Sequence, residues 1–126
     1  MKRIALVEDN EDNRLLVEAF LGERYALDLY ATGDEALAGI EARRPDLVLL
    51  DISLPIMSGS EGLRRIREHP SLRKLPVIAL TAHAMSGDRE KFLAEGFDDY
   101  ISKPILGFDK LYEPIDRLLQ ASVSSA

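Results

Sequence analysis

The sequence of 126 residues contains no cysteine. The chain therefore forms no disulfide, and it offers no thiolate ligand to a metal ion. Any metal site must be built from other side chains. The absence of disulfides is compatible with a reducing compartment, and we predict a cytoplasmic location.

Long apolar runs are also missing. The first run, residues 4–7, follows Met1-Lys2-Arg3 and is too short for the core of a signal peptide. No stretch approaches the roughly 20 apolar residues that cross a membrane. Basic residues are in the minority, with 16 Lys and Arg against 22 Asp and Glu, which gives a net charge of −6. This excess of acid argues against nucleic acid or an anionic membrane as the main partner, because phosphate groups are bound by basic patches.

The chain does contain enough apolar sequence for one core. Hydrophobic residues make up 46% and charged residues 30%, as in ordinary folded domains. A chain of this length suits one domain and is too short for two. We place the domain at residues 1–121 and expect the serine-rich segment 122–126 to be a disordered tail.

Short apolar runs predict the strands of a parallel sheet. The runs at 4–7, 47–50 and 77–80 are continuously apolar, which is typical of central strands covered on both faces. The segment 26–31 alternates between apolar and polar residues and predicts an edge strand, and a fifth strand ends near residue 102. Helix-period segments separate the strands. The pattern predicts an α/β fold of the (βα)5 type with right-handed crossovers.

Two helical segments carry specific expectations. The first has an apolar stripe formed by Leu15, Leu16, Ala19 and Phe20. The fifth has an apolar stripe formed by Leu111, Ile115, Leu118 and Leu119. Pro114 falls inside the fifth segment, where an interior proline costs roughly 3 kcal/mol or more. We therefore predict that this helix starts late, near Tyr112, or is kinked in its first turn.

Polar residues follow the predicted strands at one end. Glu8 and Asp9 follow the first run, Asp51 follows the run at 47–50, Thr81 follows the run at 77–80, and Lys103 follows the fifth strand. The carboxyl ends of parallel strands share one edge, where open α/β sheets bind ligands. Carboxylates gathered there repel one another unless a cation is bound or their pKa values rise. Oxygen ligands favour Mg²⁺, or Mn²⁺ in its place, and a strand-end aspartate is a suitable nucleophile.

Four motifs in this order resemble those of the response regulator receiver domain. They are Leu6-Val7-Glu8-Asp9-Asn10, the stretch from Leu49 to Gly59, Ala79-Leu80-Thr81-Ala82, and Tyr100-Ile101-Ser102-Lys103-Pro104. The resemblance covers about residues 2–120. It implies a flavodoxin-like, doubly wound parallel sheet with strand order 2-1-3-4-5. It also implies a single-domain response regulator of a two-component or phosphorelay pathway.

The resemblance assigns the central chemistry to strand-end residues. Asp51 is the expected phosphoacceptor. Asp9, Asp51 and the main-chain carbonyl of Ser53 are the expected ligands of Mg²⁺, and Glu8 is expected to act through a water molecule. Lys103 is expected to pair with Asp51 before phosphorylation and with a phosphoryl oxygen afterwards.

The resemblance also assigns switching and structural roles. Thr81 is expected to give its hydroxyl to the phosphoryl group, and Tyr100 to change rotamer in response. Pro104 is expected to follow a cis peptide that aims Lys103 inward. Gly59 is plausible either for a positive φ or for a close approach to the following helix.

The expected partners are a sensor histidine kinase or a histidine phosphotransfer protein, and a downstream protein that binds the face formed by the fourth helix, fifth strand and fifth helix. The resemblance also implies that the domain catalyses its own phosphorylation and dephosphorylation, and we expect no turnover of a further substrate. One alternative is a receiver module cut from a hybrid histidine kinase. Another is an aspartyl-phosphate hydrolase of the haloacid dehalogenase type, which needs a second carboxylate where this chain has Ser53.

Overall fold

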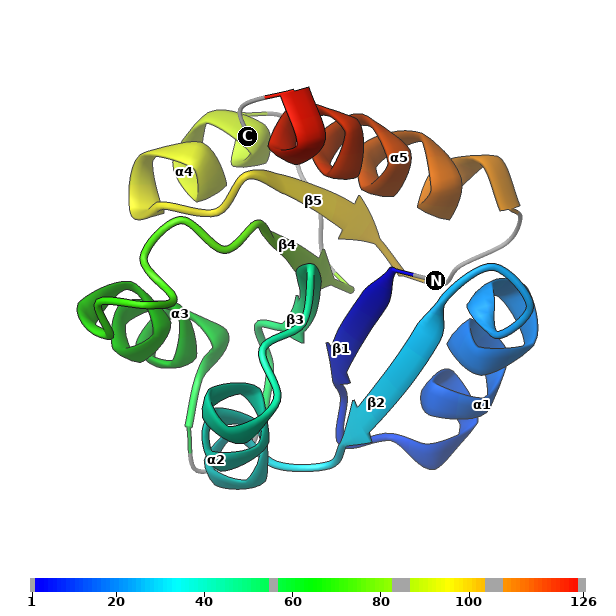
Figure 1. Cartoon of the computed structure of the whole chain (residues 1–126), viewed down its shortest axis with the longest axis horizontal. Helices are drawn as coiled ribbons and strands as arrows, with labels where there is room; N and C mark the ends of the chain where they lie inside the picture. Colours follow the sequence, from blue (N-terminus) through cyan, green and yellow to red (C-terminus); the bar gives the residue numbers. More distant parts are fainter. Residues whose placement is uncertain (1, 55–56, 83–86, 104–107, 125–126) are drawn as a thin grey trace.

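The computed structural model of the chain describes residues 2–54, 57–82, 87–103 and 108–124. Strands and helices alternate along it, as predicted (Figure 1). The strands are β1 (Arg3–Val7), β2 (Ala26–Tyr30), β3 (Leu47–Asp51), β4 (Val77–Thr81) and β5 (Asp99–Ser102). The helices are α1 (Glu11–Leu21), α2 (Gly33–Ala42), α3 (Gly59–Glu68), α4 (Asp88–Glu95) and α5 (Phe108–Ser124).

The strands form one parallel sheet in the order β2-β1-β3-β4-β5, which confirms the predicted topology. β1 has β2 on one side and β3 on the other, so the winding direction reverses between β1 and β3. The half-buried β2 lies at an edge of the sheet, as its alternating sequence indicated. The carboxyl ends of β1, β3 and β4 therefore lie side by side, next to the point of reversal.

The core lies on both faces of the sheet, because successive strand residues point to opposite sides. Val48 and Leu50 of β3 pack in the cluster that includes α2, α3 and α4 residues. Leu47 and Leu49 pack in the second cluster with residues of α1 and α5. Figure 1 shows α1 and α5 on one side of the sheet and α2 and α3 on the other. Continuously apolar strands are thus explained by burial on both faces.

Helix α1 contacts the sheet through a different stripe from the one expected. Val17 and Leu21 are its buried residues, whereas Leu15 is 55% exposed. Leu16 and Phe20 are half-buried at the margin of the same cluster. Apolar residues cover more than one side of this helix, so its sequence left the rotation about the helix axis open. Packing against the sheet decides that rotation.

The structure of helix α5 differs from the sequence prediction in two respects. It begins at Phe108 and continues through Pro114 to Ser124, so the predicted start near Tyr112 is wrong. Residues 122–124, expected to begin a disordered tail, belong to the helix, while 125–126 lie outside the described residues. Leu111 and Ile115 are fully buried on either side of Pro114. Burial of such side chains contributes about 1.5–3 kcal/mol each, which offsets the hydrogen bond that proline cannot make.

Replacing Pro114 by alanine is expected to stabilise the protein. Alanine restores a main-chain N–H inside α5 and removes the clash of the proline ring with the preceding turn. The gain is reduced because Pro114 is buried and alanine is smaller. We expect a net increase of about 1–2 kcal/mol in the free energy of unfolding, measured by urea denaturation. A lower urea midpoint would show that the packing of the proline ring contributes more than the missing hydrogen bond.

Candidate functional site

Three carboxylates meet at the carboxyl end of the sheet. Glu8 and Asp9 directly follow β1, and Asp51 is the last residue of β3. One oxygen of each lies within 4.8 Å of the others. Glu8 and Asp51 are only 1% and 2% exposed, whereas Asp9 is exposed to solvent. The parallel register of β1 with β3 brings these residues together, as the sequence predicted.

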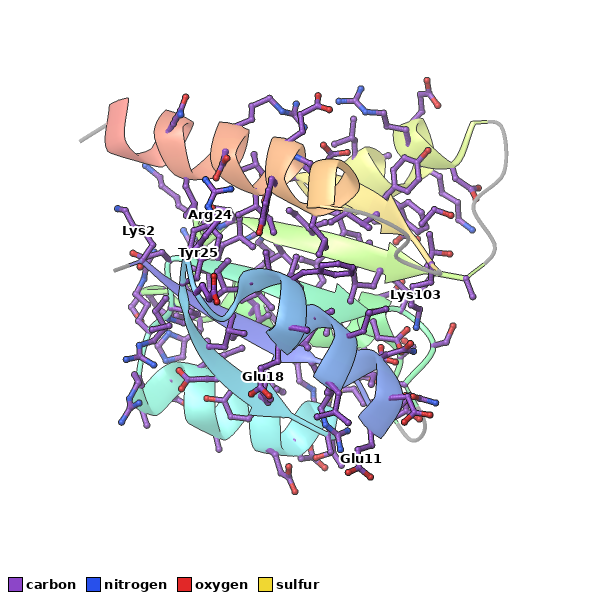
Figure 2. All side chains as sticks on the ribbon, turned by 90° about the vertical axis from the view of Figure 1, so that its right-hand side faces the viewer. Lys2, Glu11, Glu18, Arg24, Tyr25 and Lys103 are labelled. Carbon is purple, nitrogen blue, oxygen red and sulfur yellow. The ribbon has the colours of Figure 1, made fainter. Side chains whose placement is uncertain are left out.

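Lys103 supplies a positive charge to this cluster. Its Nζ lies 3.2 Å from Asp51 Oδ2 and 3.2 Å from Glu8 Oε2. The main-chain N–H of Lys103 donates to the carbonyl of Thr81 at 2.7 Å, which fixes the chain just beyond β5. Figure 2 shows Lys103 at the end of the sheet opposite Lys2. The pairing with Asp51 was expected; the equal pairing with Glu8 was not.

The burial of these charges changes their proton affinities. Burial raises the pKa of Glu8 from 4.5 to about 7, and hydrogen bonding to Asp51 adds to this rise, while the amide of Asn13 opposes it. Burial by itself lowers the pKa of Lys103, but the charges of Asp51 and Glu8 outweigh burial and raise it. Lys103 is therefore a stable cation, and Glu8 holds a proton more readily than a solvent-exposed glutamate does.

The raised pKa of Glu8 predicts a pH dependence of stability without metal. Between pH 4.5 and about 7 the folded state holds the Glu8 proton and the unfolded state does not. The contribution of Glu8 to the free energy of unfolding is therefore complete below pH 4.5 and is lost as the pH rises through about 7. We expect urea midpoints in EDTA to fall across this window. The Glu8→Gln variant should show a smaller fall, and an equal fall in both proteins would refute the assignment to Glu8.

The Asp51 side chain is held by the loop that follows β3, and this loop packs closely against α3. Its Oδ1 accepts a hydrogen bond from the main-chain N–H of Ser53 at 2.9 Å. Gly59, the first residue of α3, lies so close to the backbone of Ile52 that an added Cβ would be 2.5 Å from Ile52 Cα. The glycines with positive φ among the described residues are Gly87 and Gly96. Of the two explanations for Gly59, the structure therefore supports close approach, but to the backbone of Ile52 after β3 and not to another helix.

The expected switch residues occupy neighbouring strands. Thr81, 3% exposed, ends β4, and Asp51 pairs in register with the preceding residue, Leu80. Tyr100 lies on β5, half-buried, with its ring centroid 5.7 Å from that of Phe92 on α4. The peptide before Pro104 lies outside the described residues.

Two residues of α1 contact the site but were not identified from the sequence. The side-chain amide of Asn13 donates to Glu8 Oε1 at 2.8 Å. The guanidinium of Arg14 donates to the main-chain carbonyl of Glu8 at 2.8 Å. An asparagine inside a helix disfavours that helix relative to alanine, and this is the one signal in the sequence that could have drawn attention to position 13.

The donor set suits a hard divalent cation. The group formed by Glu8, Asp9 and Asp51 offers only carboxylate oxygens, which are the ligands that Mg²⁺ prefers. Two of the three are buried, where a charge of opposite sign is needed most. Lys103 supplies one positive charge against up to three negative ones.

Comparison with known proteins identifies the family. The family model for the response regulator receiver domain matches residues 4–116. The chain belongs to this family. Receiver domains act in two-component systems, are phosphorylated on aspartate, and interact with histidine kinases or phosphotransfer proteins. This assignment replaces the alternative of a haloacid dehalogenase-type hydrolase.

Curated relatives of the receiver differ in length. The polar-differentiation response regulator DivK of Brucella anthropi is 43% identical over 105 residues, which cover 82% of this chain and 85% of DivK. The phosphate regulon transcriptional regulatory protein PhoB of Rhizobium meliloti is 42% identical over 105 residues. These cover 82% of this chain but only 46% of PhoB, so the receiver spans about half of that relative.

A solved structure supports both the fold and the nature of the site. The receiver domain of the sensor histidine kinase PA1611 from Pseudomonas aeruginosa superposes with a TM-score of 0.84 and 38% identity. The match covers 94% of this chain and 98% of that domain. A magnesium ion is coordinated in the active-site cleft of the PA1611 receiver. Within the described part of our receiver, no helix has the length and apolar character needed to cross a membrane.

Proposed function

We propose that this receiver accepts a phosphoryl group on Asp51 from a phosphohistidine of a sensor histidine kinase or a histidine phosphotransfer protein. The observation that carries the proposal is the buried contact between Asp51 and Lys103, beside two further carboxylates. A carboxylate is buried at a strand end only at a cost, and that cost is justified where the group reacts. Its position in a receiver domain supports the same role.

The transfer uses groups that are present in the site. A carboxylate oxygen of Asp51 attacks phosphorus, the phosphorus–nitrogen bond of phosphohistidine breaks, and its electron pair returns to the imidazole nitrogen. The Ser53 N–H holds one Asp51 oxygen in place. Lys103 Nζ, 3.2 Å from Asp51, moves onto a phosphoryl oxygen as negative charge leaves the carboxylate. In dephosphorylation a water oxygen attacks phosphorus, the bond between phosphorus and the Asp51 oxygen breaks, and inorganic phosphate and the free carboxylate are released. The domain therefore catalyses both its phosphorylation and its dephosphorylation.

Asp9, Asp51 and the main-chain carbonyl of Ser53 are the proposed ligands of Mg²⁺, with Glu8 acting through water. The three clustered carboxylates support this assignment, and Mn²⁺ is proposed as a substitute because it accepts similar oxygen ligands. When bound, the cation neutralises charge on the site and on the incoming phosphoryl oxygens.

Phosphorylation is proposed to change a protein-binding face formed by α4, β5 and α5. The hydroxyl of Thr81 satisfies a new phosphoryl oxygen, and Tyr100 responds. Tyr100 contacts Phe92 of α4 and also lines a hollow of about 300 Å³ on this face. Arg89 and Arg117 flank the hollow and both pair with Asp99. A change in the position of the Tyr100 ring would thus alter a charged surface that suits a protein partner.

We infer that the receiver works as a single-domain response regulator, because it matches DivK over 85% of that protein. Its similarity to the PA1611 receiver supports the alternative of a module from a hybrid histidine kinase. The cytoplasmic location and the lack of nucleic-acid and membrane partners stay predictions.

The proposal predicts a metal-dependent phosphoryl adduct. The protein is incubated with acetyl phosphate, which donates a phosphoryl group without a kinase, in the presence of Mg²⁺, of Mn²⁺ or of excess EDTA. Intact mass should increase by one phosphoryl group with either cation and remain unchanged with EDTA. Hydroxylamine should remove the adduct, since it cleaves acyl phosphates. An adduct that forms equally in EDTA, or that resists hydroxylamine, would count against the proposed function.

A further inference from the structure

We propose that Asn13 is a positioning residue that holds the carboxylate of Glu8 in place for the divalent cation. The inference rests on the proposed function and extends it to a residue of α1. Asn13 Nδ2 donates to Glu8 Oε1 at 2.8 Å. Glu8 is 1% exposed, so this hydrogen bond lies largely out of water, where a fixed donor has its greatest effect on a carboxylate.

The position of Asn13 is itself well fixed. Its main-chain N–H donates to Asn10 Oδ1, the cap at the start of α1, at 3.0 Å. The next residue, Arg14, donates to the main-chain carbonyl of Glu8 at 2.8 Å. Consecutive residues in the first turns of α1 therefore hold Glu8 at two points, one on its side chain and one on its backbone.

The chemistry of the contact determines how the amide is oriented. The ionised Glu8 carboxylate, which is the form that faces a cation, only accepts hydrogen bonds, so the NH₂ group of Asn13 must face it, because the amide oxygen would repel it. Lys103 Nζ donates to the same carboxylate at 3.2 Å and 3.4 Å. One donor on α1 and one just after β5 thus converge on Glu8.

These two donors differ in what happens to them during phosphoryl transfer. Lys103 is shared between Glu8 and Asp51, and it follows the charge onto the phosphoryl group. Among the described residues, the Asn13 side-chain amide donates to Glu8 and has no contact with Asp51. Asn13 therefore keeps Glu8 in position when Lys103 moves. Glutamate has one more rotatable bond than aspartate, so its carboxylate needs such a restraint to present a constant position to a water molecule of the cation.

We expect Asn13 to increase the affinity of the site for Mg²⁺. Residues that orient a metal ligand by hydrogen bonding typically contribute about 10- to 100-fold to metal affinity. Because Glu8 is expected to act through water, we place the effect of Asn13 at the lower end, about tenfold in the dissociation constant for Mg²⁺.

A double-mutant cycle tests the inference. The Mg²⁺ dissociation constant is measured by isothermal titration calorimetry for the wild type, Asn13→Leu, Glu8→Gln and the double variant. Leucine has a similar size and no donor. Asn13→Leu should weaken binding about tenfold in the wild-type background and have almost no further effect in the Glu8→Gln background. If the first variant does not fold, Asn13→Ala replaces it in the same cycle.

Ala19→Gly provides the matched control for helix stability. Ala19 is an exposed residue of α1, and glycine there weakens the helix but leaves Asn13 and its cap intact, so the variant should lower the urea midpoint while changing Mg²⁺ affinity less than about twofold. An equal loss of affinity in Ala19→Gly would overturn the inference, because general loosening of α1 would then explain the effect. Equal effects of Asn13→Leu in both backgrounds would also overturn it. If the wild type binds no Mg²⁺, the proposed function fails as well.

Discussion

Replacing Asp51 by asparagine is expected to abolish the phosphoryl adduct. Asparagine keeps the shape of the side chain and can still accept the Ser53 N–H, but its amide is not a nucleophile toward phosphorus. Thr81 and Lys103 would remain in place, yet neither can substitute for the missing carboxylate. The loss should therefore be complete within the detection limit of intact-mass measurement after incubation with acetyl phosphate and Mg²⁺.

The fold of the Asp51→Asn variant is expected to remain intact. Glu8 still pairs with Lys103, and one negative charge is removed from a crowded buried group. The thermal midpoint should therefore equal or exceed that of the wild type. Asp34→Asn is a suitable control, because Asp34 is an exposed acid at the start of α2. It should be phosphorylated like the wild type, and an adduct on Asp51→Asn would place the phosphoacceptor elsewhere.

Gly59→Ala is expected to cause the largest loss of stability among single-methyl changes in α3. The added Cβ would lie 2.5 Å from Ile52 Cα and 3.0 Å from the carbonyl oxygen of Asp51. Both contacts are with backbone, which cannot rotate away as a side chain can. We expect a loss of about 3 kcal/mol in the free energy of unfolding, at the upper end of the usual cost of overpacking.

Gly62→Ala is the matched control in the same helix. Its added Cβ would lie 3.6 Å from Leu50 Cδ2, an ordinary van der Waals contact. Because alanine favours the helix over glycine, this variant should gain about 0.5–1 kcal/mol. Urea denaturation of both variants tests the argument. Similar midpoints for Gly59→Ala and Gly62→Ala would show that the backbone at Ile52 yields easily to the added methyl group.

The displacement of Ile52 should also affect chemistry, since Ile52 directly follows Asp51. Phosphorylation of Gly59→Ala by acetyl phosphate is therefore expected to be slower than that of the wild type at the same fraction of folded protein. Gly62→Ala should retain the wild-type rate.

Much of the architecture could be predicted because it depends on local patterns. Apolar runs covered on both faces specify central strands, and the alternating segment around Asp28 specifies an edge. The order of strand-end residues Glu8, Asp51 and Thr81 specifies a shared edge once the sheet is parallel. Lys103 could be assigned to the same edge because it directly follows β5, which runs parallel to the other strands.

Other features could not be predicted because they depend on how elements dock. The rotation of α1 leaves Leu15 exposed, although its sequence suits a buried position equally well. Pro114 is accommodated in α5 because burial of Leu111 and Ile115 compensates its local cost. Local propensity and tertiary packing disagree at this helix, and packing decides the outcome.

The sequence by itself determined the set of acids and one lysine that meet at the sheet edge, and its resemblance to receiver domains implied the strand order and the family. Only the tertiary structure decided that Lys103 pairs with Glu8 as well as with Asp51, and that Asn13 of α1 also binds Glu8. The reason is physical. Strand direction brings residues to a common edge through the backbone alone, whereas hydrogen-bond partners depend on side-chain positions that are fixed only when the helices pack against the sheet.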